Sequence, residues 1–174
     1  MLMKVFAKSA SIVALATLAA CASTKKTDTT DDMATQTVEP RAEVVQPAGP
    51  VPGSMEDLEK NVGHRVFFGY NQYNLTNEAQ AVLRRQAAWM KEYPEARVRL
   101  EGNCDERGTR EYNLALGARR ANAAKAYLVG LGIDPSRVSV ISNGKERPID
   151  NRSTPDAWAM NRNSTTILLS TVGA

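Results

Sequence analysis

Apolar residues recur along this chain at two spacings, one typical of helices and the other typical of strands. After Thr76, a residue type that often caps a helix, the apolar positions follow helical spacing until Pro94. A second helical stretch covers about residues 111–131 and is followed by Gly132, a residue type that often ends helices. The pattern predicts two amphipathic helices, with Gly117 as a candidate break in the second.

Strand patterns occupy four segments: residues 66–68, 97–101, 137–141 and 165–172. In the second segment polar and apolar residues alternate until Gly102 and Asn103, which are expected to end the strand. A polar stretch, residues 143–163, separates the last two strands. The predicted element order is βαβαββ. Strands that alternate with amphipathic helices favour an α/β sandwich whose sheet contains parallel pairs.

The first 20 residues have the composition of a secretory signal. Lys4 and Lys8 precede an apolar run, residues 9–20, that is too short to cross a bilayer as a stable helix. The run ends in Leu-Ala-Ala directly before Cys21, which is similar to the lipidation signal of bacterial lipoproteins. We therefore predict a lipoprotein signal peptide over residues 1–20 and lipidation of Cys21. An ordinary export signal with an incidental cysteine is the alternative.

The composition changes after Cys21. Residues 22–54 are rich in Thr, Asp, Ala and Pro and hold few large apolar side chains, which is typical of a disordered linker. A flexible chain of roughly 33 residues has a root-mean-square span near 30 Å and extends to roughly 110 Å at most. Residues 21–54 are thus predicted to be a lipidated tether, and residues 55–174 a single folded domain.

The charge balance and the cysteine count argue against several classes of protein. Without the two signal lysines, 20 of the 22 basic residues remain against 19 acidic ones, so no nucleic-acid partner is indicated. If Cys21 is acylated, Cys104 has no partner for an intramolecular disulfide and is expected to be buried. The single histidine, His64, cannot form a multi-histidine metal site. No metal or other cofactor is predicted.

The stretch from Glu101 to Ala121 carries the chemistry of a candidate binding site. Asp105 follows a strand, and Arg120 lies 15 positions later on the next helix. A carboxylate accepts hydrogen bonds from an ammonium, and a guanidinium fork matches a carboxylate, so the pair suits a zwitterionic ligand. For an isolated pair, a salt bridge between Asp105 and Arg120 is the alternative.

The sequence of this stretch, EGNCDERGTREYNLALGARRA, resembles the binding signature of the OmpA C-terminal-like domain family, and in particular that of its lipoprotein branch. The resemblance covers residues 66–169 and extends to the Lys-Glu-Arg-Pro turn at residues 145–148. It implies that the helices pack on one face of a mixed sheet. It also implies that the domain grips the diaminopimelate side chain of peptidoglycan without a catalytic step.

The family's binding residues map onto this chain through the same motif. Asp105 matches the acid, Asn113 the helix asparagine and Arg120 the second arginine of a basic pair. The resemblance implies that Asp105 holds the ammonium of the diaminopimelate centre and that Arg120 holds its carboxylate. Gly102 and Gly108 are assigned to shaping the loop between strand and helix.

The chain departs from the family pattern at several positions. Gly69 and Asn71 stand where the family usually has acids, which would weaken the electrostatic hold on an ammonium, although Asn71 still offers an acceptor for the ligand. Cys104 replaces a residue that is usually threonine or another small type, and Asn163 stands where a second arginine often follows Arg162.

The resemblance also implies a cellular location and binding partners. Ala22 rather than aspartate follows Cys21, which implies sorting to the outer membrane with the domain facing the periplasm. The lipoprotein branch binds both the cell wall and TolB of the Tol machinery, which draws the outer membrane inward during cell division. The expected function is a link between outer membrane and peptidoglycan.

Two other functions stay open. A diverged member acting mainly as a periplasmic protein-interaction module is one, because two expected acids are missing. A peptidoglycan hydrolase is the other, because Glu101, Asp105 and Glu106 cluster in sequence. Hydrolysis needs one carboxyl with a raised pKa, whereas neighbouring arginines keep acids ionised, so no enzyme activity is predicted.

Overall fold

The computed structural model describes residues 49–170 of the chain. The predicted signal peptide, the lipidation site Cys21 and most of the predicted linker lie outside this range. The elements in chain order are α1 (Met55–Asp57), the π-helical turn η1 (Leu58–Val62), β1 (Arg65–Phe67), α2 (Asn77–Glu92), β2 (Arg97–Asn103), α3 (Arg110–Gly130), the 3-10 turn η2 (Pro135–Arg137), β3 (Val138–Gly144), α4 (Pro155–Asn161) and β4 (Asn163–Ser170).

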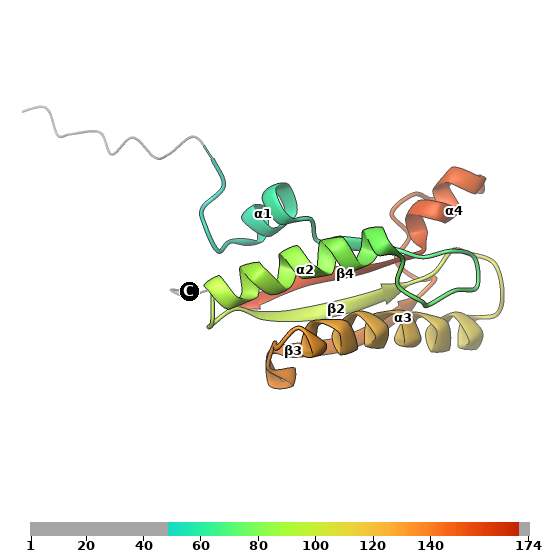
Figure 1. The fold of residues 1–174 in the computed structure, drawn as a ribbon. Coiled ribbons are helices and arrows are strands. Elements are labelled where there is room, and N and C mark those ends of the chain that lie inside the picture. Colours follow the sequence, from blue (N-terminus) through green and yellow to red (C-terminus); the bar gives the residue numbers. More distant parts are fainter. Residues whose placement is uncertain (1–48, 171–174) are drawn as a thin grey trace, which may run out of the picture. The chain divides into compact units, whose positions relative to one another are not determined.

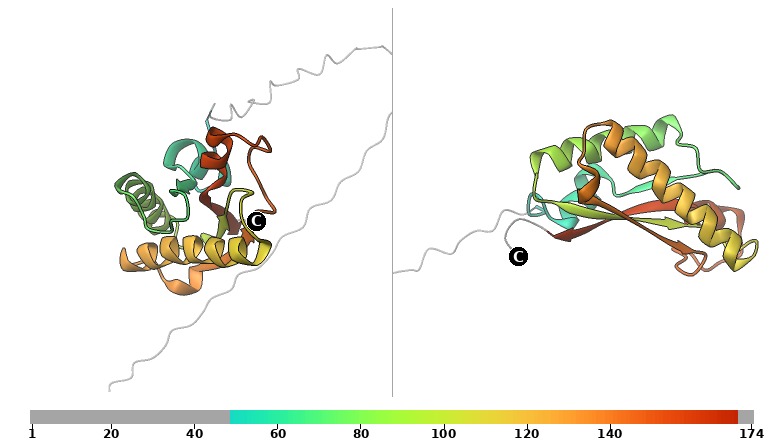
Figure 2. Two further views of the ribbon diagram at one scale, coloured as in Figure 1. Left: turned by 90° about the vertical axis from the view of Figure 1, so that its right-hand side faces the viewer. Right: turned by 90° about the horizontal axis from the view of Figure 1, so that it is seen from below.

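Four strands form one mixed sheet in the order β1-β4-β2-β3 (Figure 1). β2 pairs parallel with β3, whereas β4 pairs antiparallel with both β1 and β2. The parallel pair requires a crossover, which α3 supplies. Both long helices, α2 and α3, lie on the same face of the sheet, as the view from below in Figure 2 shows. The predicted α/β sandwich with helices on one face of a mixed sheet is confirmed.

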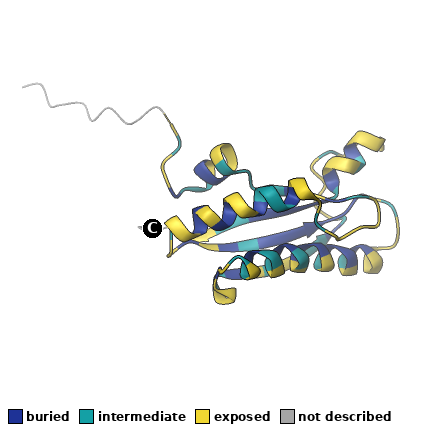
Figure 3. Ribbon diagram, in the orientation of Figure 1, coloured by how far each residue is buried: buried dark blue, intermediate teal, exposed yellow. Residues whose placement is uncertain are grey.

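The hydrophobic core fills the space between the sheet and the two long helices. Val98 and Leu100 of β2 point toward the helices, because side chains two apart on a strand share one face. Leu83 of α2 and Leu128 of α3 are fully buried against them, and Figure 3 shows the buried inner sides of both helices. Contacts group Val45–Ala174 into one compact unit with this core. We therefore expect this unit to fold by itself.

Two predictions about glycines are wrong. β2 does not end before Gly102 but continues through it to Asn103, so Gly102 belongs to a strand and does not shape a loop. Gly117 does not divide the second helix, because α3 runs unbroken from Arg110 to Gly130. One cause explains both errors. The backbones of β2 and α3 approach so closely that a Cβ on Gly117 would lie 2.7 Å from the carbonyl oxygen of Gly102.

The polar stretch before the last strand contains a helix that the sequence pattern does not predict. α4 has only seven residues, too few to display helical periodicity. Its local signals are Thr154, whose side chain accepts a hydrogen bond from Ala157 N, and Pro155 in the first turn.

The short helical segment at the start of the described range was also missed. Ser54 caps α1, and the Asp57 carboxylate accepts a hydrogen bond from Trp89 Nε1 at 2.8 Å, which ties this segment to α2. Within residues 49–170, none of the helices has the length and apolar character needed to span a membrane.

Candidate ligand-binding site

A pocket of about 110 Å³ lies where the β1–α2 loop and the β2–α3 loop meet the first turns of α3. All four residues predicted to contact peptidoglycan line it: Asn71, Asp105, Asn113 and Arg120. The pocket is small beside the roughly 300–1,000 Å³ of pockets that enclose whole ligands. It therefore suits one end of a side chain rather than an entire sugar or peptide.

Asp105 is buried in this pocket, with 4% of its surface exposed. Its carboxylate pairs with Arg107 Nη2 at 2.6 Å and with Arg162 Nη1 at 3.3 Å. Burial raises the pKa of Asp105, but hydrogen bonds from the side chain and backbone of Arg107 and from Arg162 outweigh it, so the pKa lies below the usual 3.8. The carboxylate is ionised at neutral pH.

Arg120 does not pair with Asp105, so the alternative of a salt bridge between these two residues is wrong. Its fully buried guanidinium donates to three backbone carbonyl oxygens, those of Gln72 at 2.8 Å, Asn103 at 2.8 Å and Gly69 at 3.1 Å. A fourth bond, from Nη1, reaches Cys104 Sγ at 3.4 Å. Burial lowers the pKa of Arg120. Arg120 thus fastens both pocket loops to α3, and one of its five N–H groups is left over.

Asn113 and Gly108 shape the β2–α3 loop. The buried Asn113 side chain donates to the carbonyl oxygen of Arg107 at 2.9 Å. Gly108 has a φ of 95°, in the region that L-residues rarely adopt. Cys104, buried as expected, donates from its thiol to Asn113 O at 3.4 Å, and burial raises its pKa. These contacts hold the loop against the N-terminal end of α3.

Asn71 lies on the opposite side of the pocket, in the β1–α2 loop. Its φ of 56° is the one positive value recorded for a non-glycine residue in the described part of the chain. Asparagine tolerates this conformation better than most residues. Its Oδ1 accepts a hydrogen bond from the hydroxyl of Tyr112, which links the β1–α2 loop to α3. Asn71 therefore helps to close the pocket rim as well as lining it.

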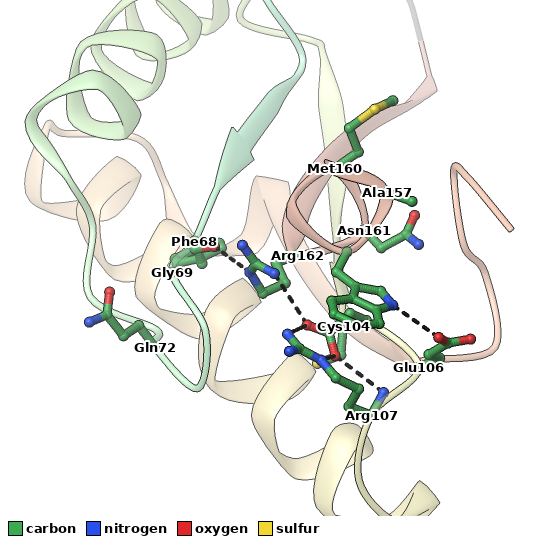
Figure 4. Close-up of polar contacts among 12 residues, drawn as sticks. Phe68, Gly69, Gln72, Cys104, Glu106, Arg107, Ala157, Met160, Asn161 and Arg162 are labelled. Carbon is green, nitrogen blue, oxygen red and sulfur yellow. Dashed lines mark hydrogen bonds and ion pairs between the residues drawn. The ribbon is translucent and has the colours of Figure 1, made fainter. Parts of the chain in front are cut away.

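Two arginines of the pocket are not among the binding residues predicted from the sequence. Arg107 lies between the rings of Tyr70 and Trp158, with its Cζ atom 4.3 Å and 4.2 Å from their centroids. Arg162, from the junction of α4 and β4, donates to Phe68 O at 3.0 Å and to Asp105 (Figure 4). From the motif, Arg107 is expected only to help shape the loop, and Arg162 is given no role beyond marking the position before Asn163. No local pattern brings Arg162, 57 positions away, to Asp105.

Glu101 lies in a separate polar network on the sheet face away from the helices. It accepts hydrogen bonds from Asn143 at 3.0 Å, Arg99 at 2.9 Å and Arg147 at 3.1 Å. Burial raises the pKa of Glu101, but these partners outweigh it and the pKa is lowered from its usual 4.5. Glu101 is a structural acid of the sheet.

This network gives a pH dependence. A group whose pKa is lowered on folding stabilises the fold above its unfolded pKa and loses that contribution as the pH falls through the folded pKa. We expect Glu101→Gln to lower the free energy of unfolding by about 1–3 kcal/mol near neutral pH. The gap between parent and variant should shrink below the usual pKa of 4.5.

Urea unfolding across this pH range measures the gap, and Glu95→Gln, at an exposed residue, is the control. A gap that stays constant from neutral pH to well below 4.5 contradicts the role of the Glu101 charge.

No cluster of three or more potential metal ligands of the His, Cys, Asp or Glu type is found among residues 49–170. The pocket instead combines one ionised carboxylate with three guanidinium groups, those of Arg107, Arg120 and Arg162. Such a set can bind the charged end of a ligand through hydrogen bonds and ion pairs. The structure is thus a small α/β domain with one charged pocket that is a candidate ligand-binding site.

Comparison with known proteins assigns this domain to a family. The model of the OmpA family matches residues 67–162. The chain therefore belongs to the OmpA family. The crystal structure of the peptidoglycan-associated lipoprotein from Burkholderia pseudomallei is similar at 36% identity and a TM-score of 0.59, covering 61% of this chain and 90% of that one. The C-terminal domain of Helicobacter pylori MotB, at 17% identity and a TM-score of 0.58, shares the fold.

Two curated relatives show how far the similarity extends. The peptidoglycan-associated lipoprotein of Rhizobium meliloti is 48% identical over 117 residues, which are 67% of this chain and 66% of that relative. The peptidoglycan-associated lipoprotein of Mesorhizobium japonicum is 41% identical over 158 residues, which are 90% of this chain and 88% of that relative. With the second relative the similarity reaches beyond the OmpA domain.

Proposed function

We propose that this chain is an outer-membrane lipoprotein whose periplasmic domain binds peptidoglycan non-covalently through meso-diaminopimelate. Acyl chains on Cys21 would hold one end in the membrane, and the domain would link that membrane to the cell wall. The observation that carries the proposal is the convergence of Asn71, Asp105, Asn113 and Arg120 on one small pocket. Membership of the OmpA family and the names of the relatives support peptidoglycan as the ligand.

The chemistry of the pocket suits this ligand. The free end of the meso-diaminopimelate side chain is an amino-acid centre with one ammonium and one carboxylate. A small pocket with charges of both signs can recognise such a centre by ion pairs and hydrogen bonds alone. Many copies on one membrane facing a polymeric wall would turn modest single affinities into firm attachment.

The acids of the site favour binding over hydrolysis. A glycosidase with two carboxylates needs one of them protonated, which requires a raised pKa. The pKa values of Glu101 and Asp105 are lowered because their hydrogen-bond and ion-pair partners outweigh burial. The pKa of Glu106 is lowered by hydrogen bonds led by the one from Trp158. None of the three suits the role of a general acid at neutral pH.

We further infer that the chain works with Tol proteins, TolB among them, in outer-membrane integrity and invagination during cell division. The support is the resemblance of residues 101–121 to the lipoprotein branch of the family.

The proposed ligand can be tested by calorimetric titration of the unit from Val45 to Ala174 with a muropeptide that contains meso-diaminopimelate. Asp105→Ala is expected to weaken binding by about 10- to 100-fold, because a buried charged group of the pocket is lost. Asp134→Ala, at an exposed helix cap outside the pocket, is the control and should bind like the parent.

A muropeptide with lysine in place of meso-diaminopimelate lacks the side-chain carboxylate and should bind far more weakly. If the parent domain does not bind the meso-diaminopimelate muropeptide, or binds the lysine form equally well, the proposed ligand is wrong.

A further inference from the structure

A groove runs beside β1, the strand at one edge of the sheet. Its wider part, of about 440 Å³, is lined by residues of β1, α4 and the start of α2. Its narrower part, of about 140 Å³, is lined by residues of β1 and α2. Phe67, Thr76 and Glu78 line both parts, so the two adjoin. Phe67 and Met160 are 50% and 43% exposed at this groove, which leaves an apolar surface open to a partner.

The backbone of β1 offers unpaired hydrogen-bonding groups at this edge. In an antiparallel pair, residues that bond to the neighbouring strand alternate with residues whose N–H and C=O point away from it. His64 O accepts from Thr166 N at 2.7 Å, and Phe68 N donates to the residue that precedes β4 at 2.9 Å, so residues 64, 66 and 68 face β4. The N–H and C=O groups of Arg65 and Phe67 therefore point to the free edge. Within residues 49–170, no turn or loop hydrogen bond uses them.

The charges in the groove favour an acidic partner. Arg65 lines the narrower part, its buried Nε has no hydrogen-bond partner within residues 49–170, and no ion pair recorded in that range includes it. In the wider part, Arg162 already donates to Phe68 O and Asp105 (Figure 4). Two arginines against one carboxylate, that of Glu78, give the lining a net charge of +1. Because an unpaired buried donor is costly, a partner's carboxylate would be bound most favourably at Arg65.

A free strand edge faced by a helix is suited to an extended peptide that joins the sheet as a further strand. Residues directly opposite each other on paired strands have their side chains on the same face. The residues opposite Arg65 and Phe67 would thus be two positions apart in the added strand. The residue between them, opposite the buried Val66, would face α2, where Ala79 and Val82 line the groove. The groove therefore specifies a short pattern of side chains.

From these contacts we infer that the groove binds an extended segment of a partner protein as an additional strand beside β1. The segment carries an acidic residue opposite Arg65 and an apolar residue opposite Phe67, with a small apolar residue between them. A second copy of the chain does not fit, because its own β1 lies equally recessed between α2 and α4. The four predicted peptidoglycan contacts do not line the groove, so the inference concerns a second surface and goes beyond the proposed function.

A blocked probe peptide, Thr-Leu-Val-Asp-Val-Leu-Thr, tests the inference. It has the same sequence in both directions, so it presents the same side chains to a parallel or an antiparallel arrangement. Titrated into the ¹⁵N-labelled unit from Val45 to Ala174, it is expected to shift the amide signals of residues 65–67 and 76–82, with a Kd of about 0.1–1 mM. Absence of shifts, or shifts centred on β3 or on the pocket around Asp105, overturns the inference. Shifts at residues 65–67 that depend on protein concentration without peptide identify a second copy as the occupant and also overturn it.

Methylation of the probe's backbone tests whether it pairs as a strand. N-methyl groups on the Asp and Leu residues remove the N–H groups that face β1 in an antiparallel arrangement, and N-methyl groups on the Val residues remove those that face it in a parallel one. One methylated probe is expected to bind at least about 10-fold more weakly than the other, which also gives the direction of the strand. Equal affinities of the two methylated probes contradict strand pairing.

Two variants with matched controls test the side chains. Phe67→Ser should weaken binding of the probe at least about 5-fold, whereas Ile141→Ser, at an exposed apolar residue on the opposite edge strand β3, should not. Arg65→Gln should reduce the preference for the Asp probe over an Asn probe at least about 3-fold, and Arg97→Gln, exposed on β2, should leave it unchanged. Equal effects of a variant and its control overturn the assignment of the groove. Because muropeptide binding is measured separately, these results leave the proposed function untouched.

Discussion

Gly102→Ala is expected to lower the free energy of unfolding by more than about 3 kcal/mol, a large part of the stability of a small domain. A Cβ on Gly102 would overlap the carbonyl oxygen of Gly117 and lie 2.5 Å from its carbonyl carbon. Both of these atoms are backbone, so no side-chain rotation can relieve the overlap. Helix α3 would have to move away from β2 and open the core beneath it.

Urea unfolding of the unit from Val45 to Ala174 measures this loss, and Gly130→Ala is its control. Gly130 ends the same helix, and a Cβ added there would meet no heavy atom within 4 Å, so alanine should be neutral or stabilise by up to about 1 kcal/mol. A Gly102→Ala variant as stable as the parent would mean that β2 and α3 are not packed as closely as described.

The close approach of α3 to β2 also determines how deeply Arg120 is buried. Gly117 precedes Arg120 by three positions, so the two lie about one helical turn apart on the same side of α3. With the helix backbone pressed onto β2 at Gly117, the Arg120 side chain lies fully buried below both pocket loops. Its hydrogen bond to Asn103 O, at the end of β2, depends on this short distance between helix and strand.

Much of the fold could be predicted from the sequence because most of its helices and strands show in the local spacing of apolar residues. The long helices and the three longer strands have enough residues for their patterns of buried positions to show, and β1, with three residues, was marked by a short apolar run. α4 was not predicted because seven residues are too few to show helical periodicity, and its N-cap residue alone is a weak signal. Gly102 and Gly117 were misread because glycine marks both chain breaks and close backbone approaches. Which of the two applies depends on a partner 15 positions away.

The sequence indicated residues that share one pocket, but not the contacts that they make. Asn71, Asp105, Asn113 and Arg120 line one pocket, yet Asp105 pairs with other arginines. Sequence spacing gives the elements that carry two charges but not the direction in which each side chain points. Arg162 enters from the far end of the chain, where only the tertiary fold brings it to Asp105.

Arg120→Met is expected to lower the free energy of unfolding by roughly 2–5 kcal/mol. Methionine keeps an unbranched apolar stem but cannot donate to the carbonyl oxygens of Gly69, Gln72 and Asn103. Buried carbonyl groups without donors are costly, and here they belong to the β1–α2 loop and to the last residue of β2, where the second pocket loop begins. Relief from burying a charge offsets part of the loss, which is why the range is wide.

Two measurements locate this effect. Urea unfolding gives the total loss, and amide hydrogen exchange should show faster exchange in the β1–α2 loop, residues 68–76, than in the core of β2. Arg120→Lys keeps a positive charge but lacks the planar fork that spans carbonyl groups of the β1–α2 loop and of the end of β2, so it should recover less than half of the lost stability.

The neighbouring arginine in the same helix is the matched control for charge and helix propensity. Arg119 is exposed and lies 5.8 Å over the ring of Tyr73, so Arg119→Met should change stability by no more than about 0.5 kcal/mol. Equal losses in the two variants would show that the buried contacts of Arg120 do not stabilise the fold. A large loss at Arg120 alone, with faster exchange in residues 68–76, is the result expected if one buried guanidinium holds both pocket loops in place.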